Sequence, residues 1–398
     1  MKLRIFLLVF FAVAVSYFAA DYLFVSSAKQ NTETVAKGLV TKAANLYRFI
    51  YRSDSMYGIR AAEELAKKQE LLDAFDHRSW ERAIAESETD VASVQGENAA
   101  IVREIMSRVQ IELNVITNMK YDRNDALFVV DSFGNVVAKN LDGLFGHQNL
   151  SGHTLFSSAV RGISDIDVVT IAGRTYKVVA TPMYIDGEIA GAYCSGDLLN
   201  NESANNIANA LNERQEPIME GGRIQFAFFN KNRLIGSSLP PETHEGFRRY
   251  IEGNKSTLEN ILQGGSRINE FDIDLAGEKF FVNISKHPGL SEDGEMFYAT
   301  MISADKVMAP LKVAHRTLGV IAIVLMVLGL ILSIVIDEYF NKPVNKFMEN
   351  MLEIINGNLK HRFDNDAEGV EGALNQNANM MIASLLGERI PDKDTGDK

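Results

Sequence analysis

The feature that most constrains this chain is an uninterrupted apolar run from Thr317 to Ile336, TLGVIAIVLMVLGLILSIVI. An α-helix rises about 1.5 Å per residue, so a charge-free run of about 20 residues is long enough to cross the ~30 Å hydrocarbon core of a bilayer. We therefore predict a transmembrane helix at 317–336. It separates a large preceding part from about 60 following residues, which is too short a segment for a catalytic domain.

A second apolar run extends from Ile5 to Val25 and is interrupted only by Asp21. Two interpretations are open. Small residues near its end are typical of a cleaved signal peptide. The apolar character continues past Asp21, however, which favours an uncleaved anchor. Lys2 and Arg4 place the start of this helix in the cytoplasm by the positive-inside rule. With one span before the second, residues 26–316 are predicted to lie outside the cytoplasm.

Composition narrows the class of protein. The chain has 398 residues, enough for about two domains, with 23% charged and 46% hydrophobic residues, as in ordinary folded proteins. The net charge of -12 argues against a nucleic-acid-binding surface. The single cysteine, Cys194, excludes an intrachain disulfide and a cysteine-based zinc site.

Residues 26 to about 120 show the three- and four-residue apolar spacing of helices. The first helix continues out of the N-terminal apolar run, and its expected buried face is Ala36, Leu39, Val40, Ala43, Leu46, Tyr47 and Ile50. Further helices are predicted over 61–75 and about 98–119. The polar segment 76–97 between them is expected to hold a break and a short helix.

From residue 126 the pattern changes to short strands separated by turns. The expected order is strand–turn–strand, a short helix, three strands and a connecting helix, over 126–140, 151–162, 165–199 and 201–214. The same order returns over 223–238, 240–253 and 266–303. IAGRTYKVVATP in the first half corresponds to LAGEKFFVNISK in the second. We infer an internal duplication of units of about 100 residues, followed by a helix at 304–316 that leads into the second span.

This linear order resembles the double Cache family of extracellular sensor domains, over roughly residues 28–312. The matching pieces are VVDSFGNVVAKN, GRTYKVVATPMYIDGEIAGAYCSGDLL, FFNKNRLIGSSLP, GEKFFVNIS and MFYATMISADKVMAPL. The resemblance implies two PAS-like lobes stacked along the long helix, with a small ligand bound most often in the distal one. The Arg-x-Trp-Tyr constellation of amino-acid-binding members is missing, because the only tryptophan, Trp80, lies in a polar helical segment.

The part after the second span resembles a HAMP domain. Two groups of residues carry this likeness: the first helix and connector with Pro343, Val344, Phe347, Met351, Ile354, Gly357, Leu359 and Phe363, and the second helix with Leu374, Ala378, Asn379 and Met381. Ala378 stands where the family has a larger residue. Two short amphipathic helices with heptad-like spacing cannot bury their apolar stripes alone. We therefore expect a parallel four-helix coil in a homodimer.

The predicted fold class is α+β: a long N-terminal helix, two PAS-like antiparallel-sheet lobes, two transmembrane helices and a C-terminal HAMP-like parallel coiled coil. The predicted boundaries are a cytoplasmic N-terminus at 1–4, a span at 5–25, a helical region at 26–121, a distal lobe at 122–200, a membrane-proximal lobe with exit helix at 201–316, a span at 317–336, a HAMP domain at 337–387 and a disordered tail at 388–398.

Candidate ligand-binding residues lie on the predicted strands and helix of the distal lobe: Arg174, Tyr176, Tyr184, Tyr193, Asp197 and Phe156. A cation, tyrosine hydroxyls and a carboxylate converging on an apolar cup suit a small zwitterion or organic acid. The alternative is that Tyr176 and Tyr193 belong to the core of the lobe and that Arg174 is an exposed turn residue.

These patterns predict a two-pass receptor of the inner (cell) membrane with a periplasmic or extracellular ligand-binding domain and a cytoplasmic HAMP domain. It is expected to be a homodimer and to signal to a separate cytoplasmic partner such as a kinase or cyclase. No motif for catalysis, a cofactor or a metal ion is present in the sequence, so we expect no enzyme activity. The alternative function is a non-signalling envelope subunit whose external domain serves in assembly or docking.

Overall fold

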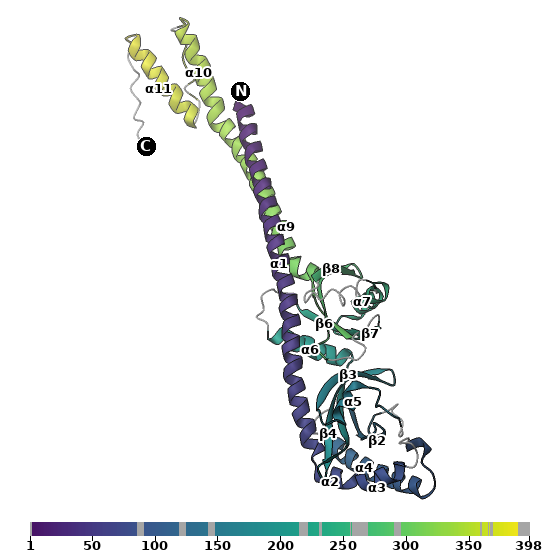
Figure 1. Cartoon of the computed structure of the whole chain (residues 1–398). Helices are drawn as coiled ribbons and strands as arrows, with labels where there is room; N and C mark the ends of the chain where they lie inside the picture. The colour runs from purple at the N-terminus through teal and green to yellow at the C-terminus, as the bar shows by residue number, and fades with distance from the viewer. Residues whose placement is uncertain are drawn as a thin grey trace. The chain divides into compact units, whose positions relative to one another are not determined.

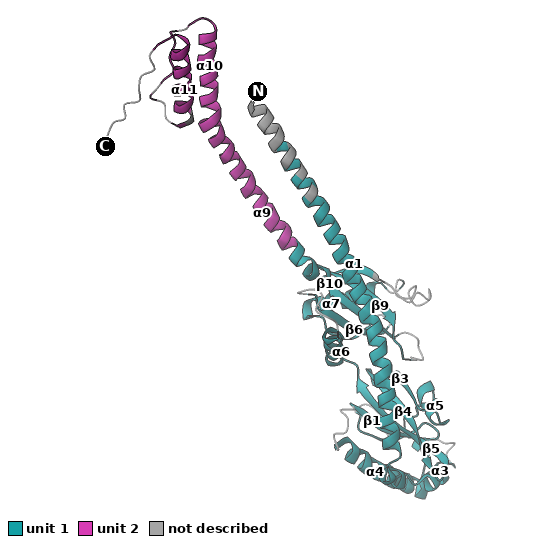
Figure 2. Cartoon of the chain, turned by 90° about the vertical axis from the view of Figure 1, so that its left-hand side faces the viewer, with its two compact units in different colours: residues 1–311 teal, residues 312–398 magenta. Residues whose placement is uncertain are grey.

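A computed structural model of the chain (Figure 1) is the basis for the following description. It describes residues 2–85, 91–118, 125–141, 148–214, 222–230, 233–254, 256, 270–289, 296–358, 360–364, 366 and 369–388, without the side chains of 2–10, 12, 13, 16, 20, 270 and 370. The chain divides into two compact units, Met1–Leu311 and Lys312–Lys398, which Figure 2 shows in teal and magenta. We call them unit 1 and unit 2.

Helix α1 extends over Lys2–Ala66 and lies along both lobes of unit 1 (Figure 1). The helix face predicted from the sequence packs on the membrane-proximal lobe. Its residues Ala36, Val40, Ala43 and Tyr47 are buried there. Much of the expected first span, 5–25, has no described side chains, so its role in a membrane stays a prediction.

The distal lobe contains four helical segments followed by a sheet. Its elements are α2 Gln69–Ala74, α3 His77–Ala85, η1 Val91–Ser93, α4 Gly96–Asn118, β1 Ala126–Asp131, β2 Val136–Lys139, α5 Thr154–Ala159, β3 Asp165–Ile171, β4 Arg174–Ile185 and β5 Glu188–Leu198. The strands form one antiparallel sheet in the order β2-β1-β5-β4-β3. Side chains alternate between its faces, so one face packs on helices α1 to α4 and the other on α5.

The proximal lobe repeats this plan. Its elements are α6 Asn201–Glu213, β6 Ile224–Asn230, β7 Arg233–Ser237, α7 Pro241–Gly253, β8 Glu270–Leu275, β9 Glu278–Lys286 and β10 Met296–Ser303. Its sheet order, β7-β6-β10-β9-β8, is the same permutation as in the distal lobe. The predicted repetition of elements is confirmed. One face packs on α1 and α6, and the other on α7.

The two lobes also share a tight hairpin turn. Ala172–Gly173 joins β3 to β4, and Ala276–Gly277 joins β8 to β9, and all four residues have positive φ. Two consecutive left-handed residues match the right-handed twist of hairpin strands, and glycine adopts this conformation without the steric cost that alanine meets. The corresponding segments in the sequence therefore specify the same turn in both lobes.

Helix α9 (Ala304–Ile336) begins directly after β10 and carries the apolar run. Pro310 lies inside it, immediately before the boundary between the two units. A five-residue π-helical turn, η2 (Asp337–Asn341), then leads into α10 (Lys342–Ile355), and α11 (Gly369–Leu385) follows. Within the described residues, one continuous helical stretch, Ala304–Ile355, is long and apolar enough to cross a membrane, and an 18-residue window within it has a mean hydropathy of 3.1.

Candidate ligand-binding site

A cavity of about 220 Å³ lies between α1 and the face of the distal sheet that packs on it. Helix α1 supplies Asp54, Tyr57, Gly58, Ala61, Ala62 and Leu65, and the sheet supplies Ile166, Lys177, Val179, Ser195, Gly196 and Asp197. The α1 residues recur at three- and four-residue intervals, so they line one side of the helix. The site is therefore built from a helix and three strands.

The polar side of the cavity combines charges of both signs. Lys177 on β4 and Asp197 on β5 are directly paired across the two strands, so their side chains leave the same face of the sheet. Asp54 approaches from α1 and Ser195 lies two residues before Asp197. Burial lowers the pKa of Lys177, while Asp54 and Asp197 act in the opposite direction and favour its charged form.

The remaining wall is apolar and comes from Ala61, Ala62, Leu65, Ile166 and Val179. Ala62 and Val179 are buried members of the core between α1 and the distal sheet. The cavity therefore places an apolar recess next to a lysine and two carboxylates. This arrangement fits a small ligand that carries both a charged group and a short hydrocarbon part.

The Lys177 side chain also contacts α1 outside the cavity lining. Its Nζ lies 4.9 Å from the centroid of the Tyr51 ring, a cation–π distance. Tyr51 is 6% exposed. Its ring meets the His287 imidazole edge-on, with centroids 4.7 Å apart and an interplanar angle of 85°. Lys177 of the distal lobe is thus separated from His287 of the proximal lobe by a single aromatic ring.

His287 belongs to an aromatic cluster between α1 and the proximal sheet, formed by Tyr47, Tyr51, Phe226, Phe228, His287 and Tyr298. Its Nδ1 accepts from the Gly289 amide at 3.2 Å, so the imidazole proton lies on Nε2, which is 2.8 Å from the Tyr47 hydroxyl. Burial, assisted by the charge of Lys177, lowers the pKa of His287 to about 3.

The six residues predicted from the sequence are not brought together. Tyr176 and Phe156 are buried in the core under α5, whereas Tyr193 is buried in the core under α1, on the opposite face. Arg174 is exposed at the β3–β4 turn, and Tyr184 is 46% exposed. The expected convergence on one cup is therefore wrong, and Asp197 is the predicted residue that lines the cavity.

The error has a structural cause. Because β4 and β5 are antiparallel and Lys177 pairs with Asp197, odd-numbered residues of both strands share a face and Tyr176 falls on the other one. Sequence reasoning missed Asp54, Lys177 and Ser195. A usable signal was the lysine in the otherwise apolar stretch of β4, because a charged residue on a buried face needs a partner or a ligand.

Trp80, which lies in a polar helical segment of the sequence, belongs to the core of the distal lobe. It is fully buried, and its indole nitrogen donates to Asp131 Oδ2 at 3.0 Å. Asp131 is also fully buried and accepts from Asn135 Nδ2 and from the amides of Phe133 and Asn135. Burial raises the pKa of Asp131, and these hydrogen bonds oppose the shift. The pair joins α3 to the β1–β2 turn.

The predicted relay residues lie in unit 2. Phe347 and Met351 of α10 pack with Phe363 and with Ala378 and Ile382 of α11, and the Phe347 and Phe363 rings are 5.0 Å apart. Asn379 holds the backbone of Phe363 twice, accepting from its amide at 2.8 Å and donating to its carbonyl at 2.9 Å.

The other predicted relay residues are more peripheral. Pro343 is the second residue of α10, Gly357 follows that helix with a φ of 103°, Leu374 is half-buried and Met381 is 51% exposed. Leu359 lies outside the described residues. The roles of all these residues in signalling stay predictions.

No protein-family model matches the chain, and no curated protein matches it. Among solved structures it is similar to the sensor domain of the V. cholerae histidine kinase DctB, with 14% identity over 68% of this chain and 97% of that one and a TM-score of 0.37. It is also similar to the sensory domain of the Campylobacter jejuni chemoreceptor Tlp3 (CcmL), with 12% identity, 71% and 98% coverage and a TM-score of 0.40.

A third similar structure is the ligand-binding domain of Mlp24 with asparagine, at 13% identity, 72% and 99% coverage and a TM-score of 0.37. All three TM-scores are below 0.5. The site and function of this chain are therefore inferred from its own residues.

Proposed function

We propose that this chain is a membrane-anchored sensor that binds a small extracytoplasmic ligand in the distal cavity and relays its binding to a separate cytoplasmic partner. The observation that carries this proposal is the cavity itself. It combines Lys177, Asp54 and Asp197 with an apolar recess, and half of its wall is α1, the helix that continues toward the predicted membrane anchor. A ligand at this position contacts both the lobe and the helix.

The charges of the cavity specify the ligand class. Two carboxylates and one ammonium group leave an excess of one negative charge, so a ligand with an amino group is favoured, and Lys177 is available to a carboxylate on the same ligand. A volume of about 220 Å³ is below the ~300 Å³ at which drug-sized pockets begin. We therefore propose a small amine or zwitterion with a short apolar part.

Strand β10 provides the route toward the membrane. The hydroxyl of Tyr298 donates to the Ala44 carbonyl at 3.1 Å, and that of Thr300 donates to the Val40 carbonyl at 3.0 Å. Two residues of β10 are therefore hydrogen-bonded to two successive turns of α1. The same strand continues into α9 without a linker. If α1 can adopt two positions and the ligand binds one of them more tightly, binding shifts the equilibrium between these positions. Strand β10 carries that shift into α9.

In unit 2 we propose a HAMP-like relay in which α10 and α11 pair with a second copy of the chain. Support comes from apolar side chains that α10 and α11 leave exposed. On α10, Met348, Leu352 and Ile355 are 58%, 53% and 72% exposed at spacings of four and three, and Met381 and Leu385 on α11 are 51% and 78% exposed. Such a stripe is the seam of a coiled coil.

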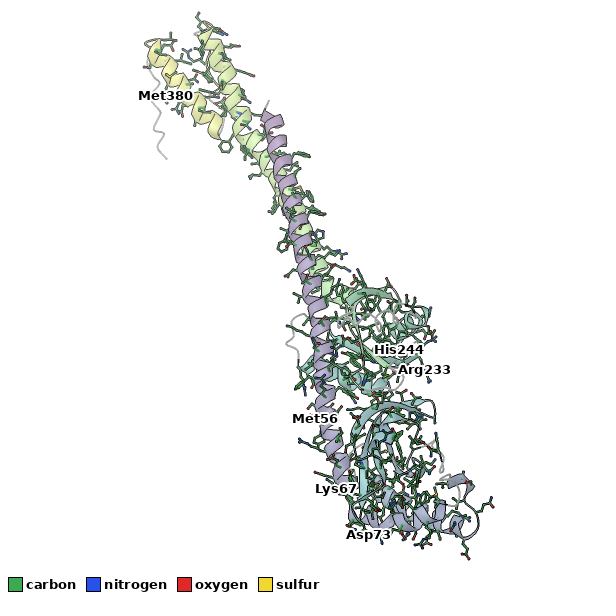
Figure 3. The ribbon with its side chains drawn as sticks, in the orientation of Figure 1. Met56, Lys67, Asp73, Arg233, His244 and Met380 are labelled. Atoms are coloured by element: carbon green, nitrogen blue, oxygen red, sulfur yellow. The ribbon has the colours of Figure 1, made fainter. Side chains whose placement is uncertain are left out.

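A docking subunit of the envelope is the second candidate function. The outward face of α1 carries Phe49 and Met56, seven residues apart and 65% and 61% exposed, and Figure 3 labels Met56 there. In this alternative the external domain binds another envelope protein through α1, and filling the distal cavity changes nothing in unit 2.

The sensor proposal is tested by thermal unfolding of the full chain in detergent with a panel of amines, zwitterions and amine-free organic acids. A cognate amine at 100 times its Kd adds about 2.7 kcal/mol, which raises Tm by about 5 °C. Asp197→Asn is expected to weaken binding at least ~10-fold, a loss of about 1.4 kcal/mol, whereas Asp73→Asn, at an exposed position of α2 (Figure 3), leaves it intact. An unresponsive Tm across the panel, or equal shifts in both variants, contradicts the site.

The relay proposal predicts efficient disulfide crosslinking between two chains in membranes at Leu352→Cys. The native Cys194 is buried, which raises the pKa of its thiol, so it does not compete. Phe347 is a poorer reporter because it packs on Phe363 of its own chain. Glu353→Cys, exposed and about 100° around α10 from Leu352, is the matched control and is expected to crosslink at least ~5-fold more slowly. Equal rates at both positions would falsify the proposed seam.

A further inference from the structure

We propose that Lys177 is a positioning residue that transmits occupancy of the distal cavity to the proximal lobe through Tyr51 and His287. The inference rests on the proposed sensor function and names the contact by which one lobe detects the state of the other. Three consecutive contacts carry it, and the first two join segments that are far apart in the sequence.

In the first contact, the Lys177 ammonium group lies next to both the cavity and the Tyr51 ring. Lys177 lines the cavity beside Asp54 and Asp197, and its Nζ lies 4.9 Å from the Tyr51 ring centroid. A ligand amine that recruits either carboxylate, or a ligand carboxylate that pairs with the lysine, changes the forces on that Nζ. Cation–π attraction strengthens when the pair is desolvated; the Tyr51 ring is buried and Lys177 is half-buried. Filling the cavity therefore changes the contact between Lys177 and Tyr51.

The second contact leaves Tyr51 little freedom to move alone. A Cβ atom added at Gly289 would lie 2.6 Å from the Tyr51 hydroxyl oxygen, so the end of the Tyr51 ring lies close against the Gly289 backbone. That hydroxyl has no hydrogen-bond partner among the described residues. The ring is therefore held by packing and by its edge-on contact with His287. Close-packed groups transmit displacement, so a shift of Tyr51 presses on residues 287–289.

The third contact leads from His287 to the strand that enters α9. The His287 backbone amide donates to the Met296 carbonyl at the start of β10 at 2.9 Å. Its imidazole Nε2 is hydrogen-bonded to the Tyr47 hydroxyl, and the centroid of the Tyr47 ring lies 4.6 Å from that of the Tyr298 ring on β10. Tyr298 in turn binds the Ala44 carbonyl of α1. The backbone amide of His287 contacts β10 directly, and its imidazole is connected to β10 through Tyr47.

The charges around this path single out Lys177. Burial raises the pKa of Tyr51, and Asp167 and Asp165 of β3 reinforce this shift, while Asp54 faces Lys177 from α1. Lys177 is the charged side chain that acts on His287 itself, where it reinforces the effect of burial. The His287 ring is neutral at pH 7 and dry, so its nitrogen resonances respond to movement of the Lys177 ammonium.

The test fills the cavity without a natural ligand. Ala61→Cys, half-buried on the cavity wall, is labelled with 2-aminoethyl methanethiosulfonate in the full chain in nanodiscs. Nitrogen-15 resonances of the seven histidines are recorded, with His287→Gln for assignment. Labelling is expected to move the His287 signals by more than a linewidth in the Lys177 background and in Lys177→Arg, which keeps the cation. The movement is expected to disappear in Lys177→Met.

Two further variants keep the outcome decisive. Tyr51→Leu removes the intervening ring and is expected to abolish the movement, whereas Tyr51→Phe retains the ring and keeps it. The same label at exposed Met56→Cys is expected to leave His287 unchanged. Unmoved His287 signals after labelling at Ala61→Cys, or an equal movement in Lys177→Met, overturn the proposal. Because no natural ligand is needed, a failed metabolite screen and a failed transmission test are separate results.

Discussion

Replacing Trp80 by alanine is expected to lower the unfolding free energy of unit 1 by about 4 kcal/mol, within the usual 3–5 kcal/mol for a buried aromatic residue. The side chain is fully buried against Phe75, with ring centroids 5.7 Å apart, and its indole nitrogen binds the buried carboxylate of Asp131. Truncation leaves a large cavity and removes one of the donors that compensate the burial of that charge. Both effects lower the unfolding free energy.

Trp80→Phe reduces the cavity effect, because it keeps an aromatic ring while it loses the N–H donor and part of the indole volume. We expect a loss of about 2 kcal/mol, the range for a hydrogen bond to a charged group. Urea unfolding of residues 26–311, followed by far-ultraviolet circular dichroism, measures both variants. Trp80 is the only tryptophan, so its fluorescence in the parent reports on the distal lobe. A loss below about 1 kcal/mol for Trp80→Ala would contradict the assigned packing.

Lowering the pH from 7 to 5 is expected to destabilise unit 1 by about 2 kcal/mol through His287 alone. An unfolded histidine takes up a proton near pH 6.5, whereas burial and Lys177 hold the folded pKa of His287 at about 3. The unfolded state therefore binds more protons between these values. The stability is complete above about pH 6.5 and is lost progressively as the pH falls toward 3.

The contribution of His287 is isolated by comparing the parent with His287→Gln, whose amide can still donate to the Tyr47 hydroxyl. Urea unfolding at pH 7 and pH 5 is expected to show a pH effect about 2 kcal/mol smaller in the variant. His244→Gln on α7, which Figure 3 labels, is the matched control and is expected to behave as the parent does. A variant with the full pH dependence of the parent would show that His287 titrates normally.

Much of the fold follows from local patterns in the sequence. The helical face at Ala36, Val40, Ala43 and Tyr47 has a single partner surface, so three- and four-residue spacing was sufficient to predict it. The repeated order of strands and the paired Ala–Gly turns likewise predicted two lobes of one plan. These features depend on contacts between near neighbours or on backbone conformation, which short segments encode.

The site was less predictable because it depends on strand register. Lys177 faces α1 only because it pairs with Asp197, and a shift of one residue would bury Tyr176 there instead. Asp54 joins them from a helix more than a hundred residues earlier in the chain, a proximity that no local pattern contains. The contact of Trp80 with Asp131 was missed for the same reason, since the polarity of α3 concealed its buried face.

The central claim is that occupancy of the distal cavity alters the packing of α10 and α11. The most direct measurement is the rate of disulfide crosslinking at Leu352→Cys in membranes, with and without an amine that raises Tm in the thermal screen. We predict a change of at least ~3-fold in this rate, about 0.65 kcal/mol, that disappears in Lys177→Met. An unchanged rate at saturating amine would contradict the sensor function and leave the chain as a docking subunit.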